Sequence, residues 1–328
     1  MSTSGTSLLP RDVPVQLIDE HGTATSDAEY PMPSAERMQQ AYASLVNGRR
    51  INDQCNALVR QGRLAVYPSS NGQEACQVAA ALALAEGDWL FPTYRDSVSV
   101  IARGVAPEDA MVLLRGDWHS GYNPHEFGVA PQSTPLATQL LHAVGFAHAA
   151  VLRGESTVVL AMCGDGTKSE CYFHEAINFA AVFKLPVVFF VQNNEFAISV
   201  PLSRQTAAPS LAHKAIGYGM PGQRVDGNDV AALLAVLEEA VDRGRRGDGP
   251  DGHVGRGIAE LAPALVALDD TPGHGEGPAQ RLRGALDVAG RQAAADVRRR
   301  PDLRAAVQGH AHDREVLLVL GQRLLDED

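Results

Sequence analysis

Apolar residues in this chain recur with spacings that predict both helices and buried strands. In 34–60 they return every three or four positions, which is the spacing of one face of a helix. We therefore expect a helix over about Ser34 to Arg60, with a buried face formed by Met38, Tyr42, Leu45 and Val46.

Two short apolar runs, 156–163 and 186–191, are rich in β-branched residues and stop at turn-forming residues. Runs of this kind suit parallel strands that are buried on both faces. Thr167, followed three residues later by Glu170, fits a capping box that would start a helix between the two runs. The order of strand, helix and strand predicts an α/β fold. The helix would bury Ala176, Ile177, Phe179, Ala180 and Phe183, which recur at helical spacing.

The composition fits a soluble enzyme and argues against several other classes of protein. With 328 residues and 45% hydrophobic content, the chain is long enough to bury one large α/β core. Its net charge of −11 argues against nucleic-acid binding, which needs a clustered basic surface. The four cysteines lack the spacing of a metal site or a disulfide framework. No run is long and apolar enough to cross a membrane and the first residues lack a signal-peptide core, so we expect a cytoplasmic location.

Polar residues follow both predicted strands at the point where each strand ends. Asp165 lies in a Gly-Asp-Gly sequence after the first run, and Asn194 ends the Asn-Asn pair after the second. Open α/β sheets bind ligands at the carboxyl ends of such neighbouring strands. Magnesium prefers oxygen ligands, so we expect Asp165, Asn194 and the carbonyl of Phe196 to hold Mg²⁺. The amides of Gly166 and Thr167, at a helix N-terminus, would then bind a diphosphate.

Either pattern alone is common, since Gly-Asp-Gly often forms a turn and Asn-Asn often ends a strand. Joined across one β-α-β unit, they resemble the thiamin diphosphate signature. Neighbouring motifs narrow the resemblance to the alpha subunit of the decarboxylating first component of 2-oxo acid dehydrogenase complexes, over about residues 35–250. These motifs, in the family's order, are Asn-Gly-Gln-Glu-Ala at 71–75, Phe-Pro-Thr-Tyr-Arg at 91–95, Gln-Ser-Thr-Pro-Leu-Ala-Thr-Gln at 132–139 and Arg-Val-Asp-Gly-Asn-Asp at 224–229.

The resemblance implies a three-layer thiamin-diphosphate-binding fold, with a mostly parallel sheet between helices. It also implies that Tyr94 and Arg95 reach the diphosphate, which suits a guanidinium because it can donate two parallel hydrogen bonds to phosphate oxygens. Gln192 matches a diphosphate neighbour that is often arginine in relatives. The alternative for Arg95 is a surface salt bridge, for example with Asp96.

Two further positions match contacts to the aminopyrimidine ring of the cofactor in the family. These are Thr134 and Leu136, which lie just before a predicted helix. The alternative is that the run 135–137 simply packs at the start of that helix.

The resemblance implies that the chain needs a partner. In split members of the family a beta subunit supplies the glutamate that activates the aminopyrimidine, within an α2β2 heterotetramer. The implied reaction is decarboxylation of a branched-chain 2-oxo acid or pyruvate and transfer of the acyl group to a lipoyl-bearing acyltransferase. Acetoin-cleaving relatives share these motifs. A non-catalytic alpha-like subunit is an alternative of a different class.

A functional loop of these relatives has no match in the C-terminal segment. Relatives continue with a strand that ends in a Tyr-Arg pair and a loop that bears a His beside a Ser, and neither pair occurs here after Tyr218. His253 and His274 are the nearby candidates, and each is better explained as an exposed loop histidine. No aromatic residue follows Tyr218 and no lysine follows Lys214. Either a helical appendage has diverged, or the reading frame shifts near residue 250.

We accordingly divide the chain into three parts. Residues 1–34 form an N-terminal arm that we expect to lie on a partner subunit. Residues 35–246 form the cofactor-binding domain, with its sheet within about 65–245. Residues 247–328 form a divergent tail rich in Arg, Ala and Gly, in which 301–325 is expected to be helical.

Overall fold

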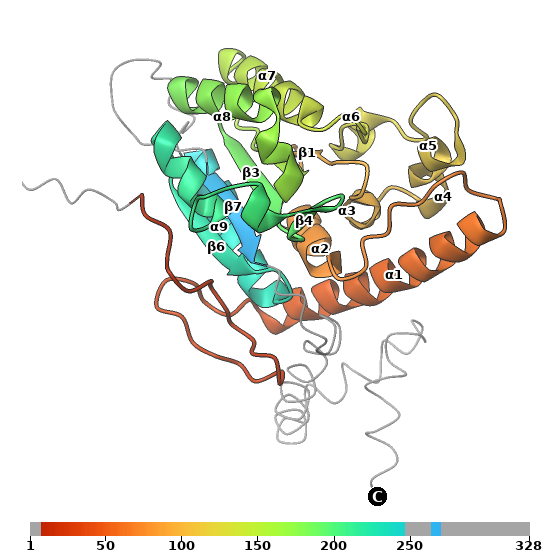
Figure 1. Cartoon of the computed structure of the whole chain (residues 1–328), viewed down its shortest axis with the longest axis horizontal. Coiled ribbons are helices and arrows are strands. Elements are labelled where there is room, and N and C mark those ends of the chain that lie inside the picture. Colours follow the sequence, from red (N-terminus) through yellow and green to blue (C-terminus); the bar gives the residue numbers. More distant parts are fainter. Residues whose placement is uncertain (1–7, 247–263, 270–328) are drawn as a thin grey trace, which may run out of the picture.

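The computed structural model describes residues 8–246 and the backbone of 264–269. Its centre is a sheet with the strand order β1-β2-β3-β7-β6, and all pairings in this sheet are parallel (Figure 1). The predicted α/β class is therefore confirmed. The strands are β1 (Trp89–Phe91), β2 (Val159–Gly164), β3 (Val187–Gln192), β6 (Gly222–Asp226) and β7 (Ala264–Asp269).

The two predicted strands, β2 and β3, lie next to each other in this sheet. Every residue of β3 is buried, as is every residue of β2 except its last, which explains why both sequences are almost entirely apolar. Their register pairs Val159 with Val187 and Gly164 with Gln192. The two strands therefore end side by side, with Asp165 and Asn193 following directly.

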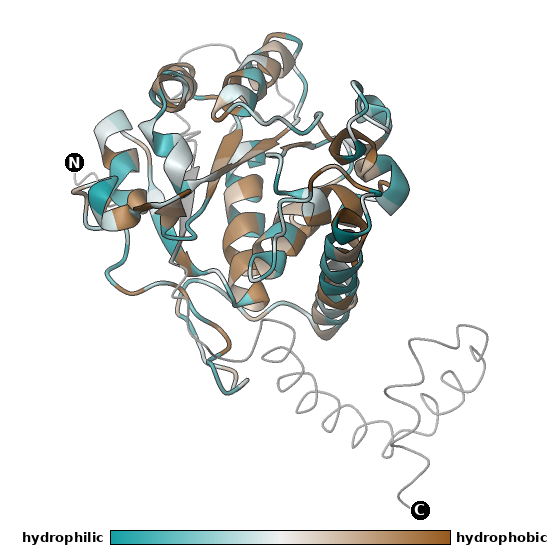
Figure 2. Ribbon diagram, turned by 45° about the vertical axis from the view of Figure 1, so that its right-hand side comes forward, coloured by the Kyte–Doolittle hydropathy of each residue, from teal (hydrophilic) through white to brown (hydrophobic). Residues whose placement is uncertain are grey.

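Helices cover both faces of the sheet, because alternate side chains of a strand point to opposite faces. Figure 2 shows apolar residues gathered on the strands and on the helix surfaces that face them. One face, which includes Leu160, Met162 and Phe190, packs against α1 (Ala35–Arg60), α2 (Glu74–Leu82), α3 (Ser97–Ala102) and α9 (Val230–Arg246). The other face, which includes Ala161, Cys163 and Phe189, packs against α7 (Thr138–Leu152), α8 (Cys171–Phe183) and the 3₁₀ helix η3 (Leu211–Tyr218).

Short elements fill several of the connections between the strands. Between β1 and α7 the chain forms α4 (Pro107–Ala110), α5 (Val112–Arg115) and α6 (Pro124–Phe127). The 3₁₀ helix η1 (Asp165–Ser169) follows β2. After β3 the chain makes a small antiparallel hairpin of β4 (Phe196–Ala197) and β5 (Val200–Pro201), and then the 3₁₀ helix η2 (Leu202–Arg204).

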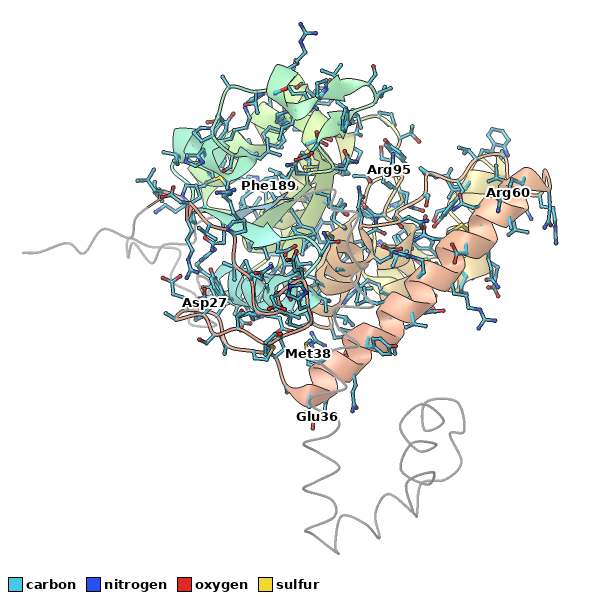
Figure 3. All side chains as sticks on the ribbon, turned by 60° about the horizontal axis from the view of Figure 1, so that its bottom comes forward. Asp27, Glu36, Met38, Arg60, Arg95 and Phe189 are labelled. Atoms are coloured by element: carbon cyan, nitrogen blue, oxygen red, sulfur yellow. The ribbon has the colours of Figure 1, made fainter. Side chains whose placement is uncertain are left out.

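The predicted helix over 34–60 is present as α1, and Ser34 caps it by accepting a hydrogen bond from the amide of Arg37. Figure 3 shows Glu36 and Met38 at the start of this helix and Arg60 at its other end. Met38 and Leu45 are buried as expected, and Tyr42 packs partly buried against the core. The inclusion of Val46 was wrong, because it is 46% exposed. One residue after Leu45 the helix has turned by about 100°, away from the core.

The predictions for α8 were right in part. Ala176, Ile177 and Ala180 are buried, but Phe179 is 38% and Phe183 50% exposed. The predicted capping box is wrong. Thr167 lies within η1, and α8 begins only at Cys171 after Glu170, with no side-chain cap.

The N-terminal arm was expected on a partner subunit, but its described part packs against this chain. Val15 pairs in parallel with Val225 of β6, and its backbone exchanges hydrogen bonds with Arg224 and Asp226. Asp229, at the start of α9, accepts hydrogen bonds from the amides of Leu17 and Ile18 at 2.6 and 2.7 Å, and from Ala231 and Ala232 at 2.9 and 3.1 Å. The arm is thus tied to the edge of the sheet.

The expected limit of the sheet at about residue 245 was also wrong. β7 lies beyond it and pairs with β3 on one side and with β6 on the other. The remaining tail residues, including the predicted helix over 301–325, lie outside the described residues. Among the helices that the structure describes, none has the length and apolar character to cross a membrane.

Candidate functional site

The predicted site residues gather at the carboxyl ends of β1, β2 and β3. The loop after β1 pairs with the segment before α7, through a parallel bridge between Thr93 and Ser133. The amide of Tyr94 donates to the carbonyl of Ser133 over 3.1 Å. This pairing brings the segment of Tyr94 and Arg95 beside the segment that leads to Thr134.

Asp165 begins η1 and is almost completely buried, with 1% of its surface exposed. Its Oδ2 accepts a hydrogen bond from Gln205 Nε2 over 3.0 Å. Gln205 Oε1 in turn accepts from Lys168 Nζ over 2.6 Å, and Lys168 also donates to the backbone carbonyl of Asp165 over 3.2 Å. Burial lowers the pKa of Lys168, while the charge of Asp165 opposes this shift. The Asp165 carboxylate is therefore held by the neutral amide of Gln205, which a metal ion can displace.

The β4–β5 hairpin lies against η1. A Cβ built on Gly166 would be 2.9 Å from the Cβ of Ala197, so only glycine allows this approach. Asn194 is exposed, and its Oδ1 accepts from the amide of Phe196 over 3.3 Å. The structure thus brings Asp165 and Gly166 to the hairpin that carries Phe196, with Asn194 at the hairpin's base. All three predicted metal ligands come from these two adjoining segments.

Arg95 does not form the alternative salt bridge with Asp96. Its Nη1 donates to the carbonyl of Ser69 over 2.8 Å, and its guanidinium lies 5.5 Å from the centre of the Tyr94 ring. Arg95 is partly buried, and Figure 3 labels it well away from Arg60 at the outer end of α1.

A network of buried side chains holds the loop that positions Arg95. Asn52 of α1 accepts hydrogen bonds from the amide and the hydroxyl of Ser70, each at 3.1 Å. Glu74, which is 2% exposed, accepts from Asn52 Nδ2 and forms a salt bridge of 2.5 Å with Arg49. The position of the Ser69 carbonyl, and through it the Arg95 guanidinium, depends on these contacts.

Asp96 is a part of the site that the sequence did not assign. Its side chain is fully buried, and burial raises its pKa. Oδ2 accepts from the amide and hydroxyl of Thr93 at 2.7 and 2.8 Å, and Oδ1 accepts from Gln192 Nε2 at 2.7 Å. The only available signal was an acidic residue directly after the Tyr-Arg pair. Its partner on β3 is 96 positions away, so the contact itself could not be predicted.

Three buried oxygen atoms at these strand ends have no hydrogen-bond partner among the described residues. They are Thr167 Oγ1, Gln192 Oε1 and Gln139 Oε1. Gln139 donates through Nε2 to the carbonyl of Met162 on β2. A buried polar atom without a partner costs about 1–3 kcal/mol, so the atoms on η1 and β3 fit a site whose ligand completes the hydrogen bonds.

Thr134 and Leu136 are exposed, Leu136 by 41%. The alternative, packing at the start of a helix, holds only for Ala137, which is fully buried with a positive φ of 65° before α7. Because Thr134 and Leu136 are exposed, they are free to contact a ligand or another chain.

Next to the hairpin lies a cavity of about 410 Å³, lined in part by Asn193, Phe196 and Ser210.

Within the described residues, no three His, Cys, Asp or Glu side chains lie together as a metal site. A metal here would therefore take one carboxylate with amide and backbone oxygens, which is the predicted set and suits magnesium. The other predicted candidates, His253 and His274, lie outside the described residues.

Comparisons with known proteins show which family this chain is similar to. The family described as "Dehydrogenase E1 component" matches residues 43–251. The 3-methyl-2-oxobutanoate dehydrogenase subunit alpha of Mycobacterium tuberculosis (strain H37Rv) is 52% identical over 239 residues, which are 72% of this chain and 65% of that protein. The pyruvate dehydrogenase E1 component subunit alpha of Staphylococcus aureus (strain Mu50) is 38% identical over 236 residues, 72% of this chain and 64% of that protein.

The chain thus spans somewhat less than two thirds of the length of these curated relatives. A solved structure from Mycobacterium smegmatis is described as a candidate thiamin diphosphate-dependent enzyme. The match covers 62% of this chain and 34% of the solved chain. Its sequence identity to this chain is 20% and the TM-score is 0.40.

Proposed function

The chain belongs to the dehydrogenase E1 component family, and we propose that it is the alpha subunit of a thiamin-diphosphate-dependent 2-oxo acid dehydrogenase. The observation that carries this proposal is the meeting of η1 with the β4–β5 hairpin, where Gly166 approaches Ala197 without a Cβ between them. This meeting gathers the proposed ligands of a metal and a diphosphate at the ends of β2 and β3.

Each residue of the site would contribute to binding or orientation. The Asp165 carboxylate, the Asn194 carboxamide and the Phe196 carbonyl would hold Mg²⁺. The amides of Gly166 and Thr167 would donate to the diphosphate, as would the hydroxyl of Thr167, which has no partner among the described residues. Thiamin diphosphate, when bound, supplies the nucleophilic carbon and the electron sink for decarboxylation.

The remaining predicted residues surround the two ends of the cofactor. Arg95 would donate two parallel hydrogen bonds to phosphate oxygens. For this its guanidinium would either turn away from the Ser69 carbonyl or keep that hydrogen bond while its other N–H groups bind the phosphate. Tyr94 adjoins it at the diphosphate end. Thr134 and Leu136 would contact the aminopyrimidine ring, and their exposure in the isolated chain is consistent with a ligand surface.

The proposed substrate is a branched-chain 2-oxo acid, with pyruvate as the alternative. The support is the 52% identity to a 3-methyl-2-oxobutanoate dehydrogenase subunit, against 38% to a pyruvate dehydrogenase subunit. Acetoin is a third candidate. A beta subunit in an α2β2 heterotetramer would activate the cofactor, and a lipoyl-bearing acyltransferase would receive the acyl group.

A non-catalytic alpha-like subunit is a second candidate. The observation that favours it is the lack of a His-Ser pair after residue 246, where relatives carry their site-closing loop. The family match also ends at residue 251. Such a subunit would bind cofactor and partner without turnover.

One experiment tests both candidates. The full chain, produced together with its beta subunit, is titrated calorimetrically with thiamin diphosphate in Mg²⁺ and then assayed with 3-methyl-2-oxobutanoate and with pyruvate. We expect binding that D165N abolishes, and turnover with the branched-chain acid. Binding without turnover on any 2-oxo acid or acetoin would favour the non-catalytic subunit. Absence of binding by the wild type would refute both.

A further inference from the structure

The side chains of Asp96 and Gln192 join two separate strand ends. Gln192 Nε2 donates to Asp96 Oδ1 over 2.7 Å, while Thr93 donates twice to Asp96 Oδ2. All three contacts use the carboxyl group only as an acceptor. An ionised carboxylate accepts hydrogen bonds and cannot donate them, so these contacts correspond to ionised Asp96.

This contact fixes the orientation of the Gln192 amide. An amide has a donor end and an acceptor end, and ionised Asp96 takes the donor end. Oε1 must then point the other way, where it is buried and has no partner among the described residues. Gln192 as a whole is 3% exposed, so solvent does not readily supply the missing hydrogen bond.

Gln192 Oε1 is a hydrogen-bond acceptor, and the diphosphate proposed for this site also presents acceptors. Gln192 pairs in register with Gly164, the residue directly before Asp165 and the proposed diphosphate amides of Gly166 and Thr167. Phosphate oxygens are acceptors, and a carbonyl oxygen beside them is repelled, whereas an amide N–H donates to them. Gln192 would support a diphosphate only after its amide turns over.

We propose that Asp96 is a positioning residue that takes up a proton when the diphosphate binds and thereby turns the Gln192 amide. In the protonated form Oδ2 still accepts from Thr93, while the O–H at Oδ1 donates to Gln192 Oε1. Nε2 is then released to donate to a phosphate oxygen. One proton moves from solvent to Asp96, and no other covalent bond changes. The inference rests on the proposed function, because it needs a diphosphate at the end of β2.

The surroundings of Asp96 favour this proton uptake. Burial raises the pKa of Asp96, whereas the positive charge of the neighbouring Arg95 lowers this pKa. The charges of Asp96 and Asp165 both raise the pKa of Cys163 on β2, which places the two acids around the same thiol. The other groups that contact the carboxyl are the neutral Thr93 and Gln192. A bound diphosphate carries negative charge that the Mg²⁺ of the same site neutralises only in part, and the remaining charge further favours the protonated form.

The test compares D96N with the wild type. The full chain, co-produced with its beta subunit, is titrated with thiamin diphosphate in saturating Mg²⁺ at about pH 6.5 and about pH 8. The new amide can donate to Gln192 Oε1 at every pH. We expect D96N to bind about tenfold more tightly than the wild type at the higher pH, or about 1.4 kcal/mol, and to lose the weakening of affinity with rising pH.

Two controls separate positioning from a structural effect. In a Q192L background the D96N substitution should change the dissociation constant less than about twofold, because no amide remains to turn. D229N removes a buried carboxylate at the start of α9 and should leave the pH dependence of binding unchanged. Circular dichroism and thermal melting establish that each variant is folded.

A second measurement needs no change at Asp96. Titrations in buffers of different ionisation enthalpy should show the wild type taking up about one more proton per bound cofactor than Q192L. Equal proton uptake, or a D96N that binds with wild-type affinity and pH dependence, would overturn the inference alone. If the wild type does not bind thiamin diphosphate, the proposed function fails and the inference fails with it.

Discussion

Gly166 lies so close to Ala197 that a Cβ on the glycine would be 2.9 Å from the Cβ of the alanine. We predict that G166A pushes the β4–β5 hairpin away from η1, because both atoms belong to short, backbone-fixed segments. The cofactor should bind at least about tenfold more weakly, and the overpacking should cost about 1–3 kcal/mol of unfolding free energy. Calorimetric titration and chemical denaturation measure the two effects.

The matched control is G164A. A Cβ on Gly164 would meet nothing closer than the Gln192 carbonyl at 3.9 Å, an ordinary contact distance. Its cofactor affinity should stay within about twofold of the wild type. Equal losses in both variants would mean that the hairpin contact has no special part in binding.

Asp229 should make the stability of the N-terminal arm depend on pH. Burial is the largest effect on this carboxyl and raises its pKa to about 6, against the backbone hydrogen bonds of the arm that lower it. Because the folded pKa lies above the unfolded one, the stability from this group is fully present below about pH 4 and is lost as the pH rises through about 6.

The measurement compares the wild type with D229N by chemical denaturation. The difference in unfolding free energy between them should shift by about 2 kcal/mol in favour of the wild type as the pH falls from about 7.5 to about 4.5. E86Q, which alters an exposed acid outside the arm and α9, serves as the control and should retain the wild-type pH dependence. A pH-independent difference between wild type and D229N would contradict the prediction.

Asn52 should affect cofactor binding although it lies on α1 and outside the proposed contact set. N52A removes the acceptor for the Ser70 amide and hydroxyl, so the Ser69 carbonyl no longer holds the Arg95 guanidinium in place. We expect unfolding free energy to fall by about 1–3 kcal/mol and cofactor affinity to fall severalfold. Q54A, on the exposed side of the same helix, should change neither quantity. If N52A is less stable but binds the cofactor with wild-type affinity, the hydrogen bonds of the loop at Ser70 do not control the position of Arg95.

The outer face of α8 should be needed for assembly. Val182 and Phe183 are 65% and 50% exposed, and the rings of Phe179 and Phe183 lie 4.4 Å apart beside His148 of α7. A surface of this kind is typical of a protein interface. The double variant V182S/F183S should fail to co-purify with the beta subunit, or the assembly that it forms should have a lower molar mass by light scattering.

The control for assembly is V66S, which removes a similarly exposed apolar side chain from a different surface. It should assemble normally. Stability of the isolated V182S/F183S chain should change little, by about 0.5 kcal/mol or less, because these side chains are already in solvent. An unchanged molar mass would show that this face is not part of the interface.

The sequence predicted the parts of the site that depend on neighbouring positions. Asp165 and Asn194 follow short apolar runs rich in β-branched residues, so their place at the carboxyl ends of buried strands could be inferred from the local pattern. Likewise, the bridge between Thr93 and Ser133 brings together two motifs that the resemblance had already placed near the cofactor.

The features that sequence did not predict depend on the packing of distant segments. The Asp96–Gln192 contact joins residues 96 positions apart, and the approach of Gly166 to Ala197 depends on how the hairpin folds back. Thr167 followed by Glu170 fits a capping box, yet η1 occupies this turn and delays α8 to Cys171. The spacing of Phe179 and Phe183 is helical, but periodicity cannot say whether the face they share meets this chain or another.

The pairing of Val15 with Val225 closes the outer edge of β6 over part of its length. A strand edge left open presents free amides and carbonyls to which strands of other molecules can add. Removal of residues 8–18 would uncover Arg224 and Asp226, whose backbone groups now bond to Val15. We therefore expect shortened forms of this chain to aggregate through this strand, which light scattering would detect.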